Sequence, residues 1–135
     1  MQVSEVMSQG IVSVNIDDTV KRVAELMKSE DVGGIPVLED NRAVGFVTDR
    51  DIVISCVAEG YDLDQPIRKA MTSEVYCVDE NQSIEEASRL MQQKKVSRIL
   101  VVDQNQSPVG MVSLQDLTQE DEDLSAETVS RIKEQ

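Results

Sequence analysis

The sequence predicts a mixed α+β fold built from two copies of one β-α-β-β-α repeat. The first observation is an internal repeat, because shifting the chain by 64 or 65 residues superimposes apolar and motif residues over about fifty positions. The matched pairs are Met7 and Met71, Val14 and Val78, Met27 and Met91, Ile35 and Ile99, Gly45 and Gly110, and Asp51 and Asp116. The second is a stretch of helical apolar spacing in each copy. The third is a pair of short apolar runs joined by turn residues in each copy.

Each repeat contains the same elements in the same order. An extended stretch comes first, and a helix follows that either Asp18 or Thr19 can cap in the first copy. Two strand-like runs separated by turn residues then predict a hairpin, and a second helix closes the first repeat. Met27 and Met91 lie on the apolar helix faces, so we interpret them as core residues. The expected ranges are 10–16 and 74–79 for the extended stretches, 17–30 and 81–95 for the first helices, 33–40 with 43–49 and 97–104 with 108–114 for the hairpins, and 50–60 for the second helix.

The repeats also predict the domain organisation. The expected divisions are 1–58 for the first repeat, 59–66 for a turn-rich linker, 67–120 for the second repeat and 121–135 for an acidic tail that permits a short helix. A unit of about fifty residues buries too little surface to be comfortably stable alone. We therefore expect the two repeats to pack through their sheets with pseudo-two-fold symmetry.

Charge and composition narrow the classes of function. The chain has 13 basic and 26 acidic residues, for a net charge of −13, which disfavours nucleic acid and anionic membrane surfaces as partners. It has no His, which excludes imidazole bases and His-ligated metals. No apolar run is long enough to cross a bilayer and no secretory signal is seen at the N-terminus. Cys56 and Cys77 are far apart in apolar settings, which favours reduced structural thiols in a cytoplasmic protein. With no His, no nucleophilic cysteine constellation and no metal signature in the sequence, we do not expect an enzyme.

A hydroxyl residue and an aspartate recur at one spacing in both repeats. Thr48 precedes Asp51 by three residues, and Ser113 precedes Asp116 in the same way. The simplest interpretation is a helix capping box, in which the hydroxyl accepts from the aspartate N–H and the carboxylate accepts in return. The alternative is a ligand site.

Three observations favour a ligand site over a cap alone. The motif is retained in both repeats although the two residues between its members change. Gly45 and Gly110 lie three positions before the hydroxyl residues, and a glycine within a strand often marks close approach by another group, such as a ligand. Free N–H groups at a helix start bind phosphate, and a carboxylate suits the two hydroxyls of a ribose. The pattern therefore predicts a sugar-phosphate site.

Both repeats resemble CBS domains, the tandem motifs named after cystathionine β-synthase. The first copy is similar through VMSQGIVSVNIDDTVKRVAELMKSEDVGGIPVLED with GFVTDRDI. The second is similar through AMTSEVYCVDENQSIEEASRLMQQKKVSRILVVD with GMVSLQDL. The resemblance extends from about Val3 to Leu117, and it is to stand-alone pairs without an attached catalytic domain.

The resemblance implies two ligand clefts between the repeats, with the ribose on the aspartate of each motif. The residues implied for the first cleft are Ser13, Val14, Ile16, Ile35, Pro36, Thr48, Arg50 and Asp51. Those implied for the related cleft are Cys77, Val78, Arg98, Ile99, Ser113 and Asp116. Arg98 is a candidate phosphate contact, although it fits a surface residue paired with Asp103 equally well. The clefts are not expected to be equivalent, because Pro36 is matched by Leu100, and the repeats also differ at Gly33-Gly34 against Ser97-Arg98.

The function implied is a regulatory module that senses AMP, ADP or ATP and has no catalytic cofactor. Two alternatives stay open: a ligand-free interaction scaffold in which both motifs are only caps, and a sensor of S-adenosylmethionine or a dinucleotide. We also expect a homodimer, because such pairs habitually dimerise and still expose apolar helix residues, here Ile52, Val53 and Val57.

Overall fold

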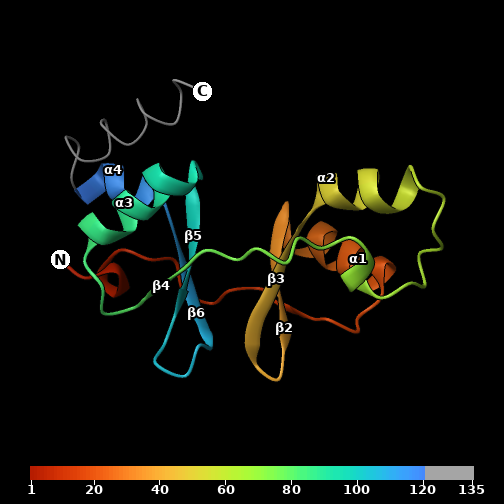
Figure 1. The fold of residues 1–135 in the computed structure, drawn as a ribbon, viewed down its shortest axis with the longest axis horizontal. Coiled ribbons are helices and arrows are strands. Elements are labelled where there is room, and N and C mark those ends of the chain that lie inside the picture. Colours follow the sequence, from red (N-terminus) through yellow and green to blue (C-terminus); the bar gives the residue numbers. More distant parts are fainter. Residues whose placement is uncertain (121–135) are drawn as a thin grey trace. The chain divides into compact units, whose positions relative to one another are not determined.

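The computed structural model describes residues 1–120, so the tail predicted at 121–135 lies outside the described residues. The chain divides into two compact units (Figure 1). One is Val12–Val75, and the other combines Met1–Ile11 with residues 76–120. The units therefore differ from the repeats of the sequence: residues 1–11 pack with the second repeat, and residues 67–75 pack with the first.

The Val12–Val75 unit is a three-stranded sheet with helices. Its elements are β1 (Val14–Asn15), α1 (Val20–Glu30), β2 (Gly34–Glu39), β3 (Arg42–Thr48), α2 (Asp49–Ile52), a π-helical segment (Val53–Val57) and a short 3-10 helix (Ile67–Lys69). The strand order is β1-β2-β3. The central strand β2 pairs in parallel with β1 and in antiparallel with β3, as the predicted hairpin requires.

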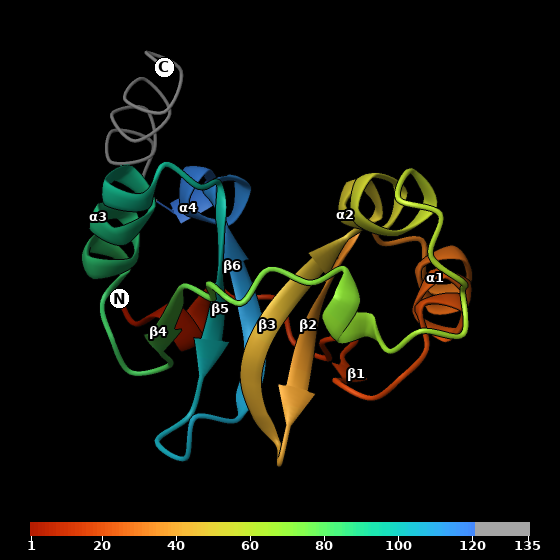
Figure 2. The ribbon, with the colours of Figure 1, turned by 45° about the vertical axis from the view of Figure 1, so that its right-hand side comes forward.

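The second unit repeats this arrangement. Its elements are a short 3-10 helix (Val3–Glu5), β4 (Cys77–Asp79), α3 (Ile84–Lys94), β5 (Arg98–Val102), β6 (Pro108–Ser113) and α4 (Leu114–Glu120). The strand order β4-β5-β6 again combines one parallel and one antiparallel pairing. The N-terminal residues lie beside β4 and α3 (Figure 2), where the Val3 N–H donates to the Gln82 carbonyl over 2.8 Å.

The first helix of each repeat is delimited by local chemistry. Thr19 caps α1 by accepting from the Arg22 N–H over 3.1 Å, and Ser83 caps α3 in the same way. Asp18, the other candidate, instead accepts from the Asn15 N–H over 2.9 Å. Both helices end at a residue in the left-handed conformation, which breaks the helical hydrogen-bond pattern.

Each unit has its own apolar core between its helices and its sheet. Met27 and Met91 are both buried, which confirms their interpretation as core residues. The Val12–Val75 core contains Val14, Ile16, Val20, Val23, Met27, Ile35, Val37, Val47, Ile52, Cys56, Ile67 and Ala70. The other core contains Val3, Val78, Ile84, Ala87, Met91, Ile99, Val101, Val112 and Leu117.

The first residues of each repeat pair with the last strand of the other repeat. Ser8 and Met111 exchange two main-chain hydrogen bonds, of 2.8 and 3.0 Å. Phe46 and Thr72 exchange two more, of 2.9 and 2.8 Å, at the corresponding place on β3. Each unit thus contains a segment from the other repeat, residues 67–75 in the Val12–Val75 unit and residues 1–11 in the other, which we call its exchanged segment.

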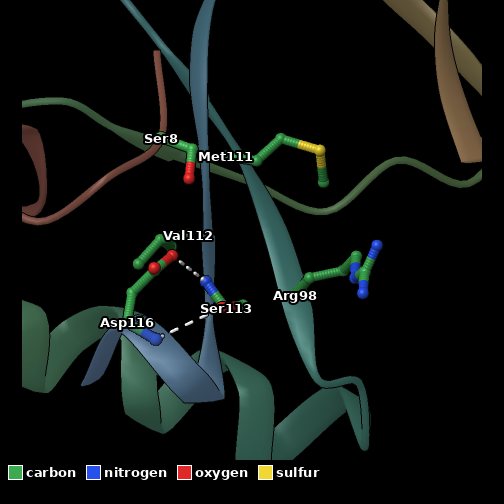
Figure 3. A pocket seen from close by; sticks show the side chains of 6 residues that line it. All are labelled: Ser8, Arg98, Met111, Val112, Ser113 and Asp116. Carbon is green, nitrogen blue, oxygen red and sulfur yellow. Dashed lines mark hydrogen bonds between the residues drawn. The ribbon is translucent and has the colours of Figure 1, made fainter. Parts of the chain in front are cut away.

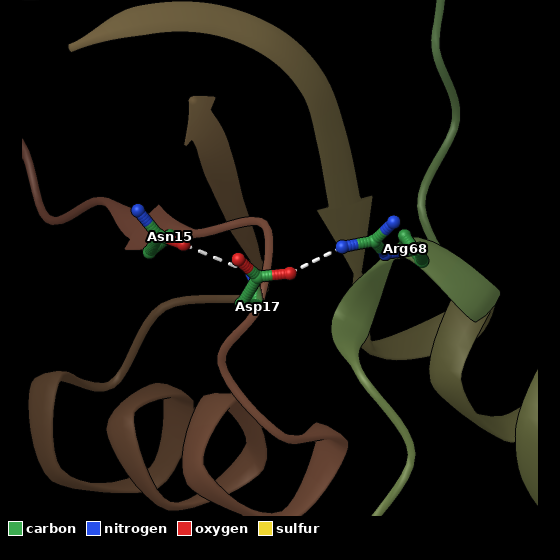
Figure 4. A network of polar contacts seen from close by, with 3 residues as sticks. All are labelled: Asn15, Asp17 and Arg68. Carbon is green, nitrogen blue, oxygen red and sulfur yellow. Dashed lines mark hydrogen bonds and ion pairs between the residues drawn. The ribbon is translucent and has the colours of Figure 1, made fainter. Parts of the chain in front are cut away.

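An ion pair also attaches the exchanged segment of the Val12–Val75 unit. The guanidinium of Arg68, in the short 3-10 helix, contacts the carboxylate of Asp17, in the turn before α1 (Figure 4). The Asp17 N–H in turn donates to Oδ1 of Asn15 over 3.0 Å. Both charged side chains are at least half exposed, so the pair positions the segment more than it stabilises it.

The predicted mixed α+β class is confirmed, with two three-stranded sheets and four α-helices in the described part of the chain. Three local expectations need correction. The first strand is only two residues long, because only Val14 and Asn15 pair with β2. The second helix continues from α2 into a π-helix. Ile52, expected at the surface, is 7% exposed because it belongs to the core, whereas Val53 and Val57 are exposed.

Candidate functional site

The first hydroxyl–aspartate motif forms a complete capping box at the start of α2. Oγ1 of Thr48 accepts from the Asp51 N–H over 3.0 Å, and Oδ2 of Asp51 accepts from the Thr48 N–H over 2.9 Å. The structure therefore realises the simplest interpretation of the motif. Oδ1 of Asp51 takes no part in the box.

The second motif is built in the same way at the start of α4. Oδ2 of Asp116 accepts from the Ser113 N–H over 2.8 Å, and Oγ of Ser113 accepts from the Asp116 N–H over 3.3 Å. The longer return bond makes this box the looser of the two at the hydroxyl. Both carboxylates are partly buried, and in each the capping bond uses only Oδ2.

The expectation of free N–H groups at these helix starts is wrong for the first motif. The Asp49 N–H donates to the Gly33 carbonyl over 3.0 Å, and the Arg50 N–H donates to Oδ1 of Asp49 over 2.8 Å. The Asp51 N–H is held by Thr48, so all three amides of the first turn have partners. The β2–β3 hairpin and the cap satisfy the donors that the sequence suggested for phosphate.

The interpretation of the two strand glycines also needs correction. A Cβ on Gly110 would lie 2.6 Å from Sδ of Met7 and 2.6 Å from the Ser8 carbonyl oxygen. A Cβ on Gly45 would lie 2.6 Å from Sδ of Met71. The group that approaches each glycine is thus the exchanged segment of the chain itself.

A pocket of about 200 Å³ lies beside the second motif (Figure 3). Its lining residues are Ser8, Arg98, Met111, Val112, Ser113 and Asp116. Arg98, Ser113 and Asp116 were predicted from the sequence, and the structure brings these three together. Sequence reasoning missed Ser8, Met111 and Val112. Ser8 comes from the exchanged segment, and its only signal in the sequence was its alignment with Thr72 in the repeat.

Arg98 lines the pocket. The side chain is exposed and extends to the same side of the hairpin as Met111 (Figure 3). The alternative pairing with Asp103 does not form in the described part of the chain. Oδ1 of Asp103 instead accepts from the N–H groups of Asn105 and Ser107, over 2.8 and 3.0 Å.

The other residues implied by the resemblance have mixed environments. The buried ones are Val14, Ile16, Ile35, Pro36, Val78 and Ile99. Ser13 and Cys77 are half-buried, and Arg50 is exposed. Burial raises the pKa of the Cys77 thiol, which keeps it protonated near neutral pH and favours the structural role expected for it. Ligand roles for all these residues stay a prediction.

The comparison with protein families decides the family of the chain. A model of the CBS domain matches residues 3–57 and 67–123. The chain belongs to the CBS-domain family. Its two CBS domains form a regulatory module, and the match indicates no catalytic family.

Relatives in two bacteria have similar sequences over most of their length. The CBS domain-containing protein YhcV of Bacillus subtilis is 39% identical over 115 residues, which cover 85% of this chain and 81% of that protein. Hypoxic response protein 1 of Mycobacterium tuberculosis is 32% identical over 115 residues, which cover 84% of this chain and 80% of that protein.

Solved CBS structures share the fold. Hypoxic Response Protein I with two coordinated zinc ions matches with a TM-score of 0.76 and 30% identity, over 88% of this chain and 98% of that one. The CBS domain pair of protein MJ0100, solved with 5'-methylthioadenosine and S-adenosyl-L-methionine, matches with a TM-score of 0.73 and 20% identity, over 89% of this chain and 94% of that one.

Neither a metal site nor a membrane span is found among residues 1–120. No group of three His, Cys, Asp or Glu side chains in that range is placed to hold a metal ion. None of the helices described there has the length and apolar character needed to cross a bilayer.

Proposed function

We propose that this CBS pair is a regulatory module that binds an adenine nucleotide, AMP, ADP or ATP, using the pocket beside Ser113 and Asp116. The observation that supports the proposal is the combination of groups in that pocket. Residues that carry a hydroxyl, a carboxylate and a guanidinium all line one pocket of about 200 Å³. A sugar-phosphate needs these three kinds of group.

The roles follow from the chemistry of each side chain. Asp116 uses Oδ2 in its capping box, so Oδ1 is the oxygen available to accept from a ribose hydroxyl. Arg98 supplies the charge-assisted donors that suit a phosphate. Its position matters because the chain has a net charge of −13, and only a cation within roughly a Debye length, about 8–10 Å, offsets that repulsion locally.

The fold relationship is consistent with an adenosyl ligand. The MJ0100 pair, which shares the fold at 20% identity, was solved with two adenosyl compounds. S-adenosylmethionine is therefore the main alternative ligand for this chain. A phosphate uses Arg98, whereas a sulfonium cation is repelled by it, and this difference favours the nucleotide.

Calorimetric titration tests the proposal. AMP, ADP, ATP and S-adenosylmethionine are titrated separately into the whole chain, and heat of binding is expected with at least one of the nucleotides. The informative variant is Asp116→Asn, which keeps one oxygen for the capping bond but replaces an acceptor with a donor. It is expected to weaken nucleotide binding at least about tenfold.

The matched control is Asp103→Asn. Asp103 is also a carboxylate that accepts main-chain hydrogen bonds in the same unit, but it does not line the pocket. This variant is expected to bind nucleotide as the unchanged protein does. No heat with any of the compounds at millimolar concentration contradicts the proposal and leaves the scaffold interpretation.

A second candidate function is homodimerisation through the π-helical segment. Val53, Ile54 and Val57 are 56%, 49% and 58% exposed, and they are consecutive or one turn apart on one helix. Apolar side chains gathered in this way are typical of an interface. We propose a second copy of the chain as the occupant. Sedimentation equilibrium is expected to show a dimer that Val57→Lys weakens, and a monomer at all concentrations contradicts it.

A further inference from the structure

The two motifs sit on hairpins with the same register. Gly34 pairs with Thr48 on the β2–β3 ladder, and Arg98 pairs with Ser113 on the β5–β6 ladder. Gly34 therefore occupies the place of Arg98 in the Val12–Val75 unit. The first amides of the two helices have corresponding partners as well. The Asp49 N–H donates to the carbonyl of Gly33, which precedes Gly34. The Leu114 N–H donates to the carbonyl of Ser97, which precedes Arg98, and both bonds are 3.0 Å long.

The same registers place Phe46 opposite Pro36 and Met111 opposite Leu100, so the Phe46 ring corresponds to the Met111 thioether. This ring fills the space beside Gly34. A Cβ on Gly34 would lie 2.8 Å from Cε1 and 3.0 Å from Cζ of Phe46. A side chain of any kind at position 34 thus collides with the ring where it now lies. The Gly34–Phe46 pair excludes the guanidinium that Arg98 contributes to the other unit.

The charges at the two places differ as well. Asp49 replaces the apolar Leu114, and its carboxylate lies over Gly33, where a Cβ would be 3.4 Å from Oδ2. Asp49 and Asp51 thus place two carboxylates in the first turn of α2, and the only cation between them is the exposed Arg50. The other motif has Asp116 alone, and Arg98 across the hairpin from Ser113.

We propose that the chain binds the phosphate of a nucleotide at the Arg98 pocket alone, and that the Gly34–Phe46 pair closes the corresponding place in the Val12–Val75 unit to phosphate. The stoichiometry is then one nucleotide per chain, although the hydroxyl–aspartate motif occurs twice. This inference rests on the proposed function, because it assigns the phosphate of the same ligand to one of two repeated sites.

Calorimetry with AMP and adenosine separates the phosphate from the nucleoside. For the unchanged chain, AMP is expected to bind with a stoichiometry near one. Arg98→Ala is expected to weaken AMP at least about tenfold, as loss of a charge-assisted hydrogen bond does, and to leave adenosine affinity unchanged. Arg50→Ala tests the other motif, to which the resemblance assigns Arg50, and the single-site inference expects it to leave AMP affinity and stoichiometry unchanged. Arg89→Ala is the matched control, because Arg89 is an exposed arginine of α3 in the same unit that does not line the pocket.

The outcomes distinguish this inference from the proposed function. Two AMP molecules per chain, or weakening of AMP by Arg50→Ala rather than by Arg98→Ala, overturns the single-site inference while nucleotide binding itself stands. No binding of AMP, adenosine, ADP, ATP or S-adenosylmethionine by the unchanged chain overturns both. Circular dichroism of each variant verifies that the fold is retained, and all three arginines are exposed, so none of the substitutions removes core packing.

Discussion

Gly110→Ala is expected to detach the N-terminal segment from β6. The new Cβ would lie 2.6 Å from the Ser8 carbonyl oxygen, whereas a carbon and an oxygen in ordinary contact are about 3.3 Å apart. The segment must therefore move by about 0.7 Å. Such a shift takes the 2.8 Å bond from the Ser8 N–H to the Met111 carbonyl out of the normal range.

The loss of stability combines the overpacking at the new Cβ with the loss of the two hydrogen bonds. Overpacking typically costs about 1–3 kcal/mol, and each of the two hydrogen bonds between Ser8 and Met111 contributes about 1 kcal/mol net. A destabilisation of about 3–5 kcal/mol is therefore expected for the unit that contains β6. Adding Met7→Ala relieves the sulfur contact but is not expected to rescue stability, because the carbonyl contact is with main chain.

Two measurements check this reasoning. Urea unfolding followed by circular dichroism gives the overall change, and hydrogen exchange by mass spectrometry assigns it to a unit, since the two units need not unfold together. Faster exchange is expected in residues 1–11 and 108–113 but not in 12–66. Gly33→Ala is the control, because its Cβ would meet only the flexible Asp49 carboxylate, at 3.4 Å. Unchanged exchange in β6 with a stability change below about 0.5 kcal/mol refutes the argument.

Three further predictions concern local contacts. Arg68→Ala removes an exposed ion pair with Asp17 and is expected to cost no more than about 1 kcal/mol, with a smaller effect at high salt; a larger loss in urea unfolding contradicts this. Thr19→Ala removes the cap of α1 and is expected to cost about 1 kcal/mol by the same measurement, whereas Thr19→Ser restores it. Burial raises the pKa of Cys77, so its alkylation by iodoacetamide near pH 8 is expected to be slower than that of a free thiol and to accelerate in urea. Cys56 has no exposed surface and is expected to react only in urea, and equal native rates for both thiols contradict this.

The proposed phosphate site depends on a difference between the surroundings of the two hydroxyl–aspartate motifs. Both copies of the motif make the same capping box, so the cap alone does not distinguish a scaffold from a sensor. The difference lies across the hairpin, where one copy has Arg98 and the other has Gly34 beneath Phe46. Because a net charge of −13 repels phosphate in general, the position of one cation decides where a nucleotide is expected.

The order of elements, the hairpins, the capped helices and the hydroxyl–aspartate motif could all be predicted from the sequence. These features depend on residues a few positions apart: helical spacing, turn residues, and a cap whose partners are three residues apart. The internal repeat then determined that each element occurs twice. The resemblance to CBS domains also placed Arg98, Ser113 and Asp116 together, and the structure shows that Arg98 pairs with Ser113 across the β5–β6 hairpin.

Only the tertiary structure decided which segment lies against which strand. Ser8 and Met111 are about a hundred residues apart, and no local pattern specifies their pairing. That pairing explains why position 110 requires glycine, adds Ser8 to the pocket, and divides the chain into units that differ from its repeats. Similarly, two glycines in a row could not reveal that the Phe46 ring lies over Gly34. The physical reason is that packing is determined by the space between side chains, which sequence spacing does not encode.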